Sequence, residues 1–66
     1  MFKNLKEELD RKGITIRAVA SLLNCSEKTI QNKLNGETEF TLSEVLLIGD
    51  NLFPEFRLHY LFKRSA

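Results

Sequence analysis

Apolar residues recur along the chain at the three- and four-residue spacing of α-helices. In the first segment they are Phe2, Leu5 and Leu9, which this spacing places on one face of a helix. Gly13 predicts the end of that helix, because glycine readily adopts the left-handed conformation of a helix C-terminus. The chain is therefore expected to begin with an amphipathic helix.

Two short helices are predicted to follow. Thr15 can cap the second helix and Ser26 the third, because a hydroxyl oxygen accepts a hydrogen bond from a backbone N–H of the first turn. Asn24 lies between them, where asparagine tolerates the left-handed backbone of a tight turn. The third helix is expected to run to about Leu34 and to end at the pair Asn35-Gly36.

Two further helices are predicted in the C-terminal half. Thr41 and Glu44 have the spacing of a capping box, in which each side chain accepts a hydrogen bond from the other residue's backbone N–H. The helix after them is expected to be the most buried one, with the apolar residues Val45, Leu46, Ile48, Leu52 and Phe53. Pro54 fits the first turn of a fifth helix, which carries Phe56, Leu58, Leu61 and Phe62. No period of two is sustained, so the predicted fold class is all-α.

Length and composition point to one small domain over residues 1–66. No apolar run is long enough for a transmembrane helix or a signal-peptide core. Cys25 is the only cysteine and His59 the only histidine, so neither an internal disulfide nor a zinc cluster of these residues can form. We expect Cys25 to be a small core residue and His59 to lie on the surface. These features are typical of a cytoplasmic protein without a metal, another cofactor or a small-molecule ligand.

The formal net charge of the chain is only +1. A nucleic-acid-binding domain usually carries a clear basic excess. A nucleic-acid function must therefore be argued from the local arrangement of residues.

The third predicted helix has a polar face opposite its apolar one. At about 100° per residue, Ile30 and Leu34 lie about 40° apart and mark the inward side. The outward side carries one lysine and three amides: Lys28, Gln31, Asn32 and Asn35. Such side chains can donate to and accept from base edges in a major groove, which admits an α-helix. A solvated helix surface without a function can have the same composition.

The stretch TIRAVASLLNCSEKTIQNKLNG, residues 15–36, resembles the helix-turn-helix of the Cro and phage-repressor (Xre-type) DNA-binding proteins. The resemblance covers roughly residues 5–53. The matching residues are Gly13-Ile14-Thr15, Val19-Ala20, Leu23, Cys25-Ser26, Thr29-Ile30 and Asn35-Gly36. The resemblance implies a five-helix lambda-repressor-like domain whose third helix is the recognition helix. It also implies a transcriptional regulator, such as a phage or prophage repressor, that binds pseudo-palindromic double-stranded DNA as a homodimer.

The same resemblance implies a set of DNA-contacting residues. Base contacts are expected from the third helix, at Glu27, Lys28, Gln31 and Asn32. Contacts to the DNA backbone are expected at Thr15, Arg17, Lys33, Asn35 and Thr38. Phosphate contacts would set the orientation, while Lys28 and Asn32 would discriminate between bases. Glu27 can accept from a cytosine amino group, or it can simply be a negative charge that favours a helix N-terminus.

Aromatic residues gather near the C-terminus, where the last 14 residues contain four of the six aromatic side chains. On a helix, Phe56 and Tyr60 share a side that Leu58 and Leu61 do not. One of the two sides is then surplus to the core, and an exposed apolar side commonly contacts a partner. We therefore predict a homodimer contact through Phe56 and Tyr60. The alternative is that the monomer core uses every aromatic ring.

A second class of function is compatible with the same chain. Ile16 stands where the family has a glutamine that donates to phosphate, and Glu37 and Glu39 would repel phosphate. With an exposed Leu22, these residues favour a helix-turn-helix-derived protein–protein interaction module with weak or no DNA binding. An enzyme is disfavoured, because the sequence contains no recognisable nucleophile–base pair, metal cluster or phosphate-binding loop.

Overall fold

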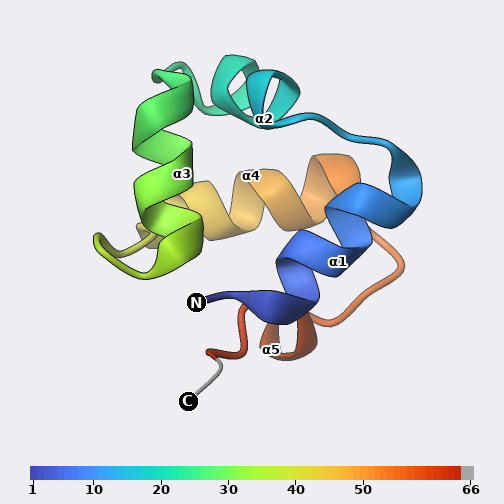
Figure 1. Cartoon of the computed structure of the whole chain (residues 1–66). Helices are drawn as coiled ribbons and strands as arrows, with labels where there is room; N and C mark the ends of the chain where they lie inside the picture. The colour runs from blue at the N-terminus through green and yellow to red at the C-terminus, as the bar shows by residue number, and fades with distance from the viewer. Residues whose placement is uncertain (65–66) are drawn as a thin grey trace.

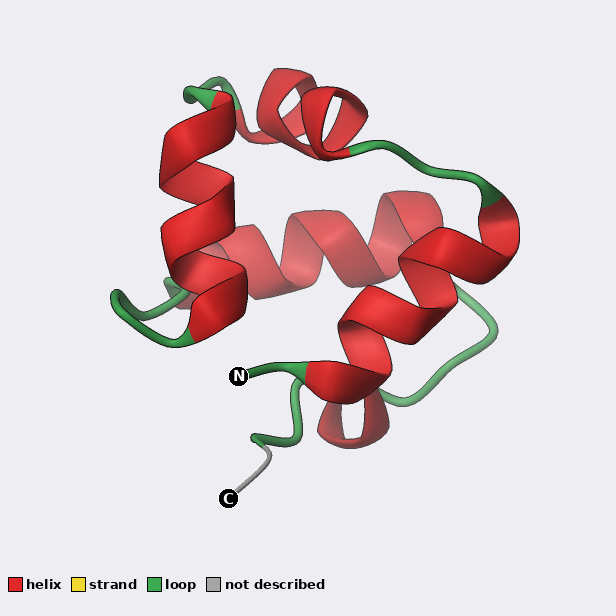
Figure 2. Cartoon of the chain, viewed as in Figure 1, coloured by secondary structure: helices red, strands yellow, loops and turns green. Residues whose placement is uncertain are grey.

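The computed structural model describes residues 1–64. They form five helices in the order α1 (Lys3–Lys12), α2 (Ile16–Leu23), α3 (Glu27–Asn35), α4 (Leu42–Leu52) and α5 (Leu58–Leu61). The described part of the chain contains no strand (Figure 2), which confirms the all-α fold class. None of its helices has the length and apolar character needed to cross a membrane.

The predicted N-terminal caps of three helices are confirmed. Thr15 Oγ1 accepts a hydrogen bond from the backbone N–H three residues later at 3.1 Å, and Ser26 Oγ does the same at 3.2 Å. Thr41 and Glu44 form both hydrogen bonds of a capping box. A cap of this kind stabilises a helix by about 1 kcal/mol. The starts of α2, α3 and α4 are thus encoded by residues next to them in the chain.

The first three helices end in residues with a left-handed backbone. Gly13, Asn24 and Gly36 have φ angles of 69°, 56° and 86°, so the predicted helix ends are confirmed. Gly36 is also tightly packed, because a Cβ atom there would lie 3.2 Å from the backbone nitrogen of Met1. The end of α3 therefore lies close against the beginning of the chain.

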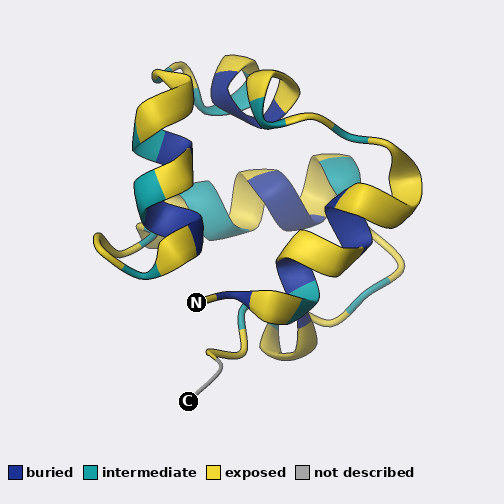
Figure 3. Ribbon diagram, in the orientation of Figure 1, coloured by how far each residue is buried: buried dark blue, intermediate teal, exposed yellow. Residues whose placement is uncertain are grey.

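The helices enclose one hydrophobic core. In Figure 1, α4 crosses the middle of the molecule, and it contacts α2 and α5. The buried apolar residues are Phe2, Leu5, Leu9, Val19, Ala20, Ile30, Leu34, Ile48, Phe53 and Leu61. Figure 3 shows buried positions on the sides of α1, α3 and α4 that face one another. The inward faces predicted for the first and third helices are therefore confirmed.

The prediction that the fourth helix is the most buried one is wrong. Only Ile48 and Gly49 are buried in α4, whereas Leu42, Leu46 and Leu47 are 74%, 43% and 42% exposed. In a domain of this size, few elements are available to surround a central helix. α4 therefore buries one stripe and leaves the rest of its surface in solvent.

The fifth helix is shorter than predicted and begins later. Pro54 and Glu55 lie in a turn, and the Phe56 N–H donates to the Phe53 carbonyl oxygen at 3.1 Å before the helix starts. The chain must reverse direction after α4 so that α5 can contact both α1 and α4. A helix continued from Pro54 would not make this reversal.

Candidate nucleic-acid interface

α2 and α3 pack against each other across a short turn. Asn24 provides the left-handed residue of this turn, and the Cys25 N–H donates to the Ala20 carbonyl oxygen at 3.0 Å. Ala20 and Val19 are only 4% and 1% exposed. Cys25 is half-buried and packs against the core, which confirms its predicted place. α3 is therefore held in a defined position on the body of the protein.

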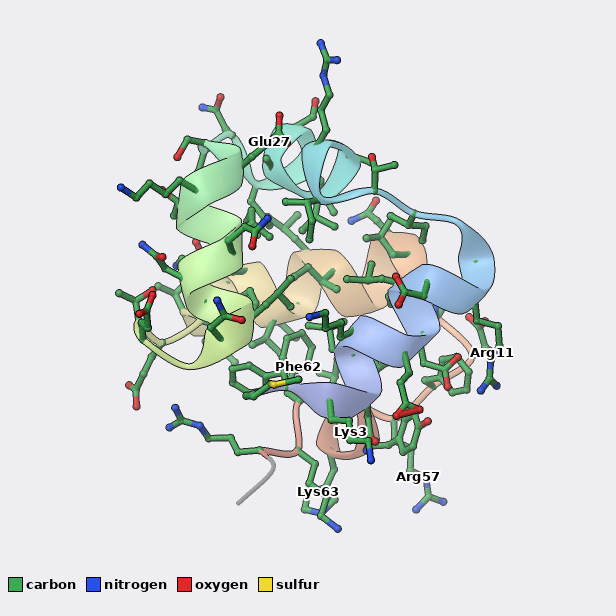
Figure 4. The ribbon with its side chains drawn as sticks, viewed as in Figure 1. Lys3, Arg11, Glu27, Arg57, Phe62 and Lys63 are labelled. Carbon is green, nitrogen blue, oxygen red and sulfur yellow. The ribbon has the colours of Figure 1, made fainter. Side chains whose placement is uncertain are left out.

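The inward face of α3 is built from Ile30 and Leu34, which are 0% and 4% exposed. The other side chains of interest on α3 are Glu27, Lys28, Gln31 and Asn35, which are all exposed, and Asn32, which is half-buried. Glu27 lies at the end of α3 that adjoins α2 (Figure 4). None of these five side chains forms a hydrogen bond or ion pair with another residue of the described chain. They are available to a partner.

Two residues predicted to contact the DNA backbone flank the start of α2. Thr15 and Arg17 are both exposed. The Thr15 oxygen accepts the capping hydrogen bond, and its hydroxyl proton is still free to donate. Thr38, in the loop after α3, is also exposed. The structure therefore places all three on the molecular surface, at the two ends of the α2–α3 pair.

Lys33 is directed into the protein and is only 9% exposed. Its ammonium group donates to Glu44 Oε1 and to the Glu39 carbonyl oxygen at 3.3 Å. It also lies 5.8 Å from the centre of the Phe40 ring. This placement corrects the predicted phosphate contact, because the charge of Lys33 is used to fasten the loop after α3 to α4. The spacing of Lys33 and Glu44 in the sequence does not indicate this ion pair, because the two residues are eleven positions apart and lie in different helices.

Glu44 has an altered pKa at this contact. Burial acts to raise the pKa of Glu44, but the hydrogen bonds from Lys33 and from the Thr41 backbone, with the Lys33 charge, together lower the pKa below its usual value. The carboxylate therefore stays charged, and it serves both the capping box and the Lys33 ion pair.

Two apolar residues singled out in the sequence face the core more than solvent. Ile16 and Leu22 are half-buried and pack against the buried cluster. The predicted exposure of Leu22 is therefore wrong, because α2 turns a broad apolar side towards α3 and α4. Glu37 and Glu39 are exposed, as their charge requires. Arg64 partly offsets the negative charge of Glu39, because Arg64 Nη1 lies 3.7 Å from Glu39 Oε1.

Phe56 and Tyr60 are largely engaged within the monomer. Phe56 is half-buried, with its ring centre 6.0 Å from that of Phe53 and 5.5 Å from that of Tyr60. The Tyr60 hydroxyl donates to Glu8 Oε2 at 2.8 Å, and this hydrogen bond, with burial and the Glu8 charge, raises the pKa of Tyr60. Glu8 is only 2% exposed, and its position among the polar residues of the first helix does not indicate this burial. Tyr60 itself remains 39% exposed, and the dimer contact stays a prediction.

The described residues offer neither a catalytic histidine cluster nor a metal site beside the α3 face. His59 is exposed on α5, as predicted. Residues 1–64 contain no group of three or more His, Cys, Asp or Glu residues that could hold a metal ion, and no pocket. Comparisons of the chain with protein-family models, with curated proteins and with solved structures gave no match.

Proposed function

We propose that this protein is a sequence-specific DNA-binding transcriptional regulator that reads the major groove with α3 of a lambda-repressor-like helix-turn-helix domain. The outward face of α3 carries the proposal: Lys28 and Gln31 are exposed and free of internal partners, with Asn32 beside them. The opposite face is anchored by Ile30 and Leu34. A helix that packs on the core through its apolar face and exposes a polar face to solvent can enter the major groove.

Each side chain of this face has a matching partner on DNA. The Asn32 and Gln31 amides can pair with adenine, the Lys28 ammonium with guanine, and the Glu27 carboxylate with a cytosine amino group. Thr15, Arg17, Asn35 and Thr38 would contact phosphates. Those contacts would orient the protein, and the base contacts would select the sequence.

The proposal includes a homodimer on a pseudo-palindromic operator in the cytoplasm, working without a cofactor or ligand. Its half-sites would lie about 34–36 Å apart, one turn of the DNA helix. The exposed part of Tyr60, next to Phe56, is the proposed contact between the two copies.

Selection of binding sites from random duplex DNA tests this function. We expect recovered sites with two related half-sites. Asn32→Ala should then weaken binding to the selected site by about 1–3 kcal/mol and leave binding to random DNA almost unchanged. Asn51→Ala is the control, because Asn51 is an exposed amide on α4 that bonds within its own helix. Equal losses on both DNAs would remove Asn32 from the base-reading residues.

A second candidate function is a protein–protein interaction module. It is favoured by the exposed carboxylates of Glu37 and Glu39 beside α3 and by the exposed leucines of α4: Leu42, Leu46 and Leu47. A folded protein that selects no DNA sequence, and in which Lys28→Gln and Asn32→Ala change no DNA affinity, would favour this module over the regulator.

A further inference from the structure

The small net charge conceals a strong separation of charge along the chain. Residues 1–6 and 56–64 contain five of the ten Lys and Arg residues and none of the nine Asp and Glu residues, a formal charge of +5. Residues 7–55 contain five Lys and Arg residues against nine Asp and Glu residues, a formal charge of −4. The two end segments therefore carry half of the positive charge and none of the negative charge of the Asp and Glu side chains.

The fold brings these two positive segments together. α1 contacts α5, and the Asn4 side-chain amide donates to the Tyr60 carbonyl oxygen at 2.9 Å. Arg64 lies 5.6 Å from the centre of the Phe2 ring. Figure 4 shows Lys3, Arg57 and Lys63 projecting from the end of the molecule where α5 lies, whereas Glu27 lies at the opposite end. We call the surface formed by Lys3, Arg57 and Lys63 the chain-end face.

No carboxylate of residues 1–64 neutralises the cations of the chain-end face. Lys3, Arg57 and Lys63 are exposed, and none of them takes part in an ion pair of the described residues. In contrast, Arg11, Lys12, Lys33 and Arg64 are each within 4 Å of a carboxylate. Glu55, two residues before Arg57, is the carboxylate closest to this face in sequence, and it is paired with Lys12 at 2.6 Å. Glu7 lies one turn after Lys3 on α1. Unpaired exposed cations of this kind attract a polyanion.

We propose that the chain-end face binds the phosphodiester backbone of duplex DNA without regard to sequence. This goes beyond the proposed function, because it needs no base reading by α3. A small phosphorylated ligand requires a concave site, and residues 1–64 contain no pocket. A membrane-binding helix needs a long amphipathic face, whereas α5 has four residues. Long cationic side chains on an open surface can each contact one of the regularly spaced phosphates of a DNA backbone.

The binding of random duplex DNA as a function of salt tests this proposal. Each cation that neutralises a phosphate contributes about 0.9 to the slope of log K against log salt. The triple variant Lys3→Gln/Arg57→Gln/Lys63→Gln should lower the slope by up to about 2.7. Arg57→Gln alone should lower it by about 0.9 and Arg11→Gln, its matched control, by much less. Arg11 is 71% exposed, but its guanidinium group is paired with Glu8 at 3.7 Å, so its charge is already partly neutralised.

The outcomes separate this proposal from the function of α3. A folded triple variant with the wild-type affinity and slope overturns the chain-end face, whatever Asn32→Ala does. A triple variant that loses random-DNA binding supports it, even if no sequence is selected and α3 reads nothing. A folded wild-type protein that binds no duplex at about 50 mM salt also overturns it. Binding of polyglutamate in that last case would assign the face to an acidic protein partner.

Discussion

The ammonium group of Lys33 and the carboxylate of Glu44 join the end of α3 to the start of α4. Their side chains are only 11% and 19% exposed, so water screens the pair much less than an ion pair on the surface. Lys33 also donates to the Glu39 carbonyl oxygen. This one cation thereby fixes the loop that follows the candidate recognition helix.

Replacement of Lys33 by methionine tests this contact. We expect Lys33→Met to lower the free energy of unfolding by about 2 kcal/mol, because it leaves the Glu44 carboxylate partly buried without its counter-charge. In the double variant Lys33→Met/Glu44→Gln, the free energy of unfolding should fall by less than the sum of the decreases in the two single variants. The expected coupling energy is about 1 kcal/mol. Urea unfolding of the four proteins measures the coupling, and strict additivity would show that the pair contributes nothing.

The lowered pKa of Glu44 predicts a loss of stability in acid. Because the pKa is lower in the folded protein, the stabilisation is fully present above the usual value of 4.5 and is lost as the pH falls through the folded-state pKa. The urea midpoint of the wild-type protein should therefore fall more between pH 6 and pH 3 than that of Glu44→Gln. Parallel pH profiles for the two proteins would contradict this assignment.

At the scale of elements, α3 is a short helix whose start depends on one hydroxyl group. Ser26 Oγ accepts from the Thr29 N–H, and the two hydroxyl oxygens are 2.9 Å apart. We expect Ser26→Ala to destabilise the protein by about 1 kcal/mol and Ser26→Asp to retain most of the stability, because aspartate is also a good cap. Thermal unfolding followed by circular dichroism measures both. Equal destabilisation by the two substitutions would mean that the cap is not the cause.

The starts of α2, α3 and α4 and the ends of α1, α2 and α3 could be predicted from sequence, because their signals are local. Thr15, Ser26 and Thr41 act on backbone groups three residues away, and Gly13 and Gly36 need only their own φ angle. The outward Lys28 and Gln31 followed from the position of Ile30 in the same helix.

Features that depend on packing between distant segments could not be predicted in this way. The inward turn of Lys33 depends on Glu44, and the burial of Glu8 depends on Tyr60, 52 residues later. The short α5 and the exposed leucines of α4 depend on how the whole chain folds back. Helical periodicity states which residues share a side, but it does not state how much of a helix the neighbouring elements cover.

At the scale of the whole molecule, aromatic rings tie three distant segments together. The ring centres of Phe2, Phe40 and Phe62 lie 5.3 to 6.1 Å from one another in edge-to-face arrangements. They belong to the start of the chain, the loop after α3 and the residue after α5. Such pairs stabilise by about 0.5–1.5 kcal/mol each beyond the burial of their surface. This cluster holds the positive ends of the chain in one place.

A molecule with a positive end and a negative body is an electric dipole, and copies of it attract one another head to tail. At about 10 mM salt the screening length is about 30 Å, longer than the 26 Å extent of the molecule, whereas at physiological salt it is about 8 Å. We therefore expect light scattering to show a mass that grows with concentration at about 10 mM salt and stays constant at about 150 mM. Such contacts join unlike surfaces and need not close, so the low-salt species would be open chains, which Arg57→Gln/Lys63→Gln should shorten.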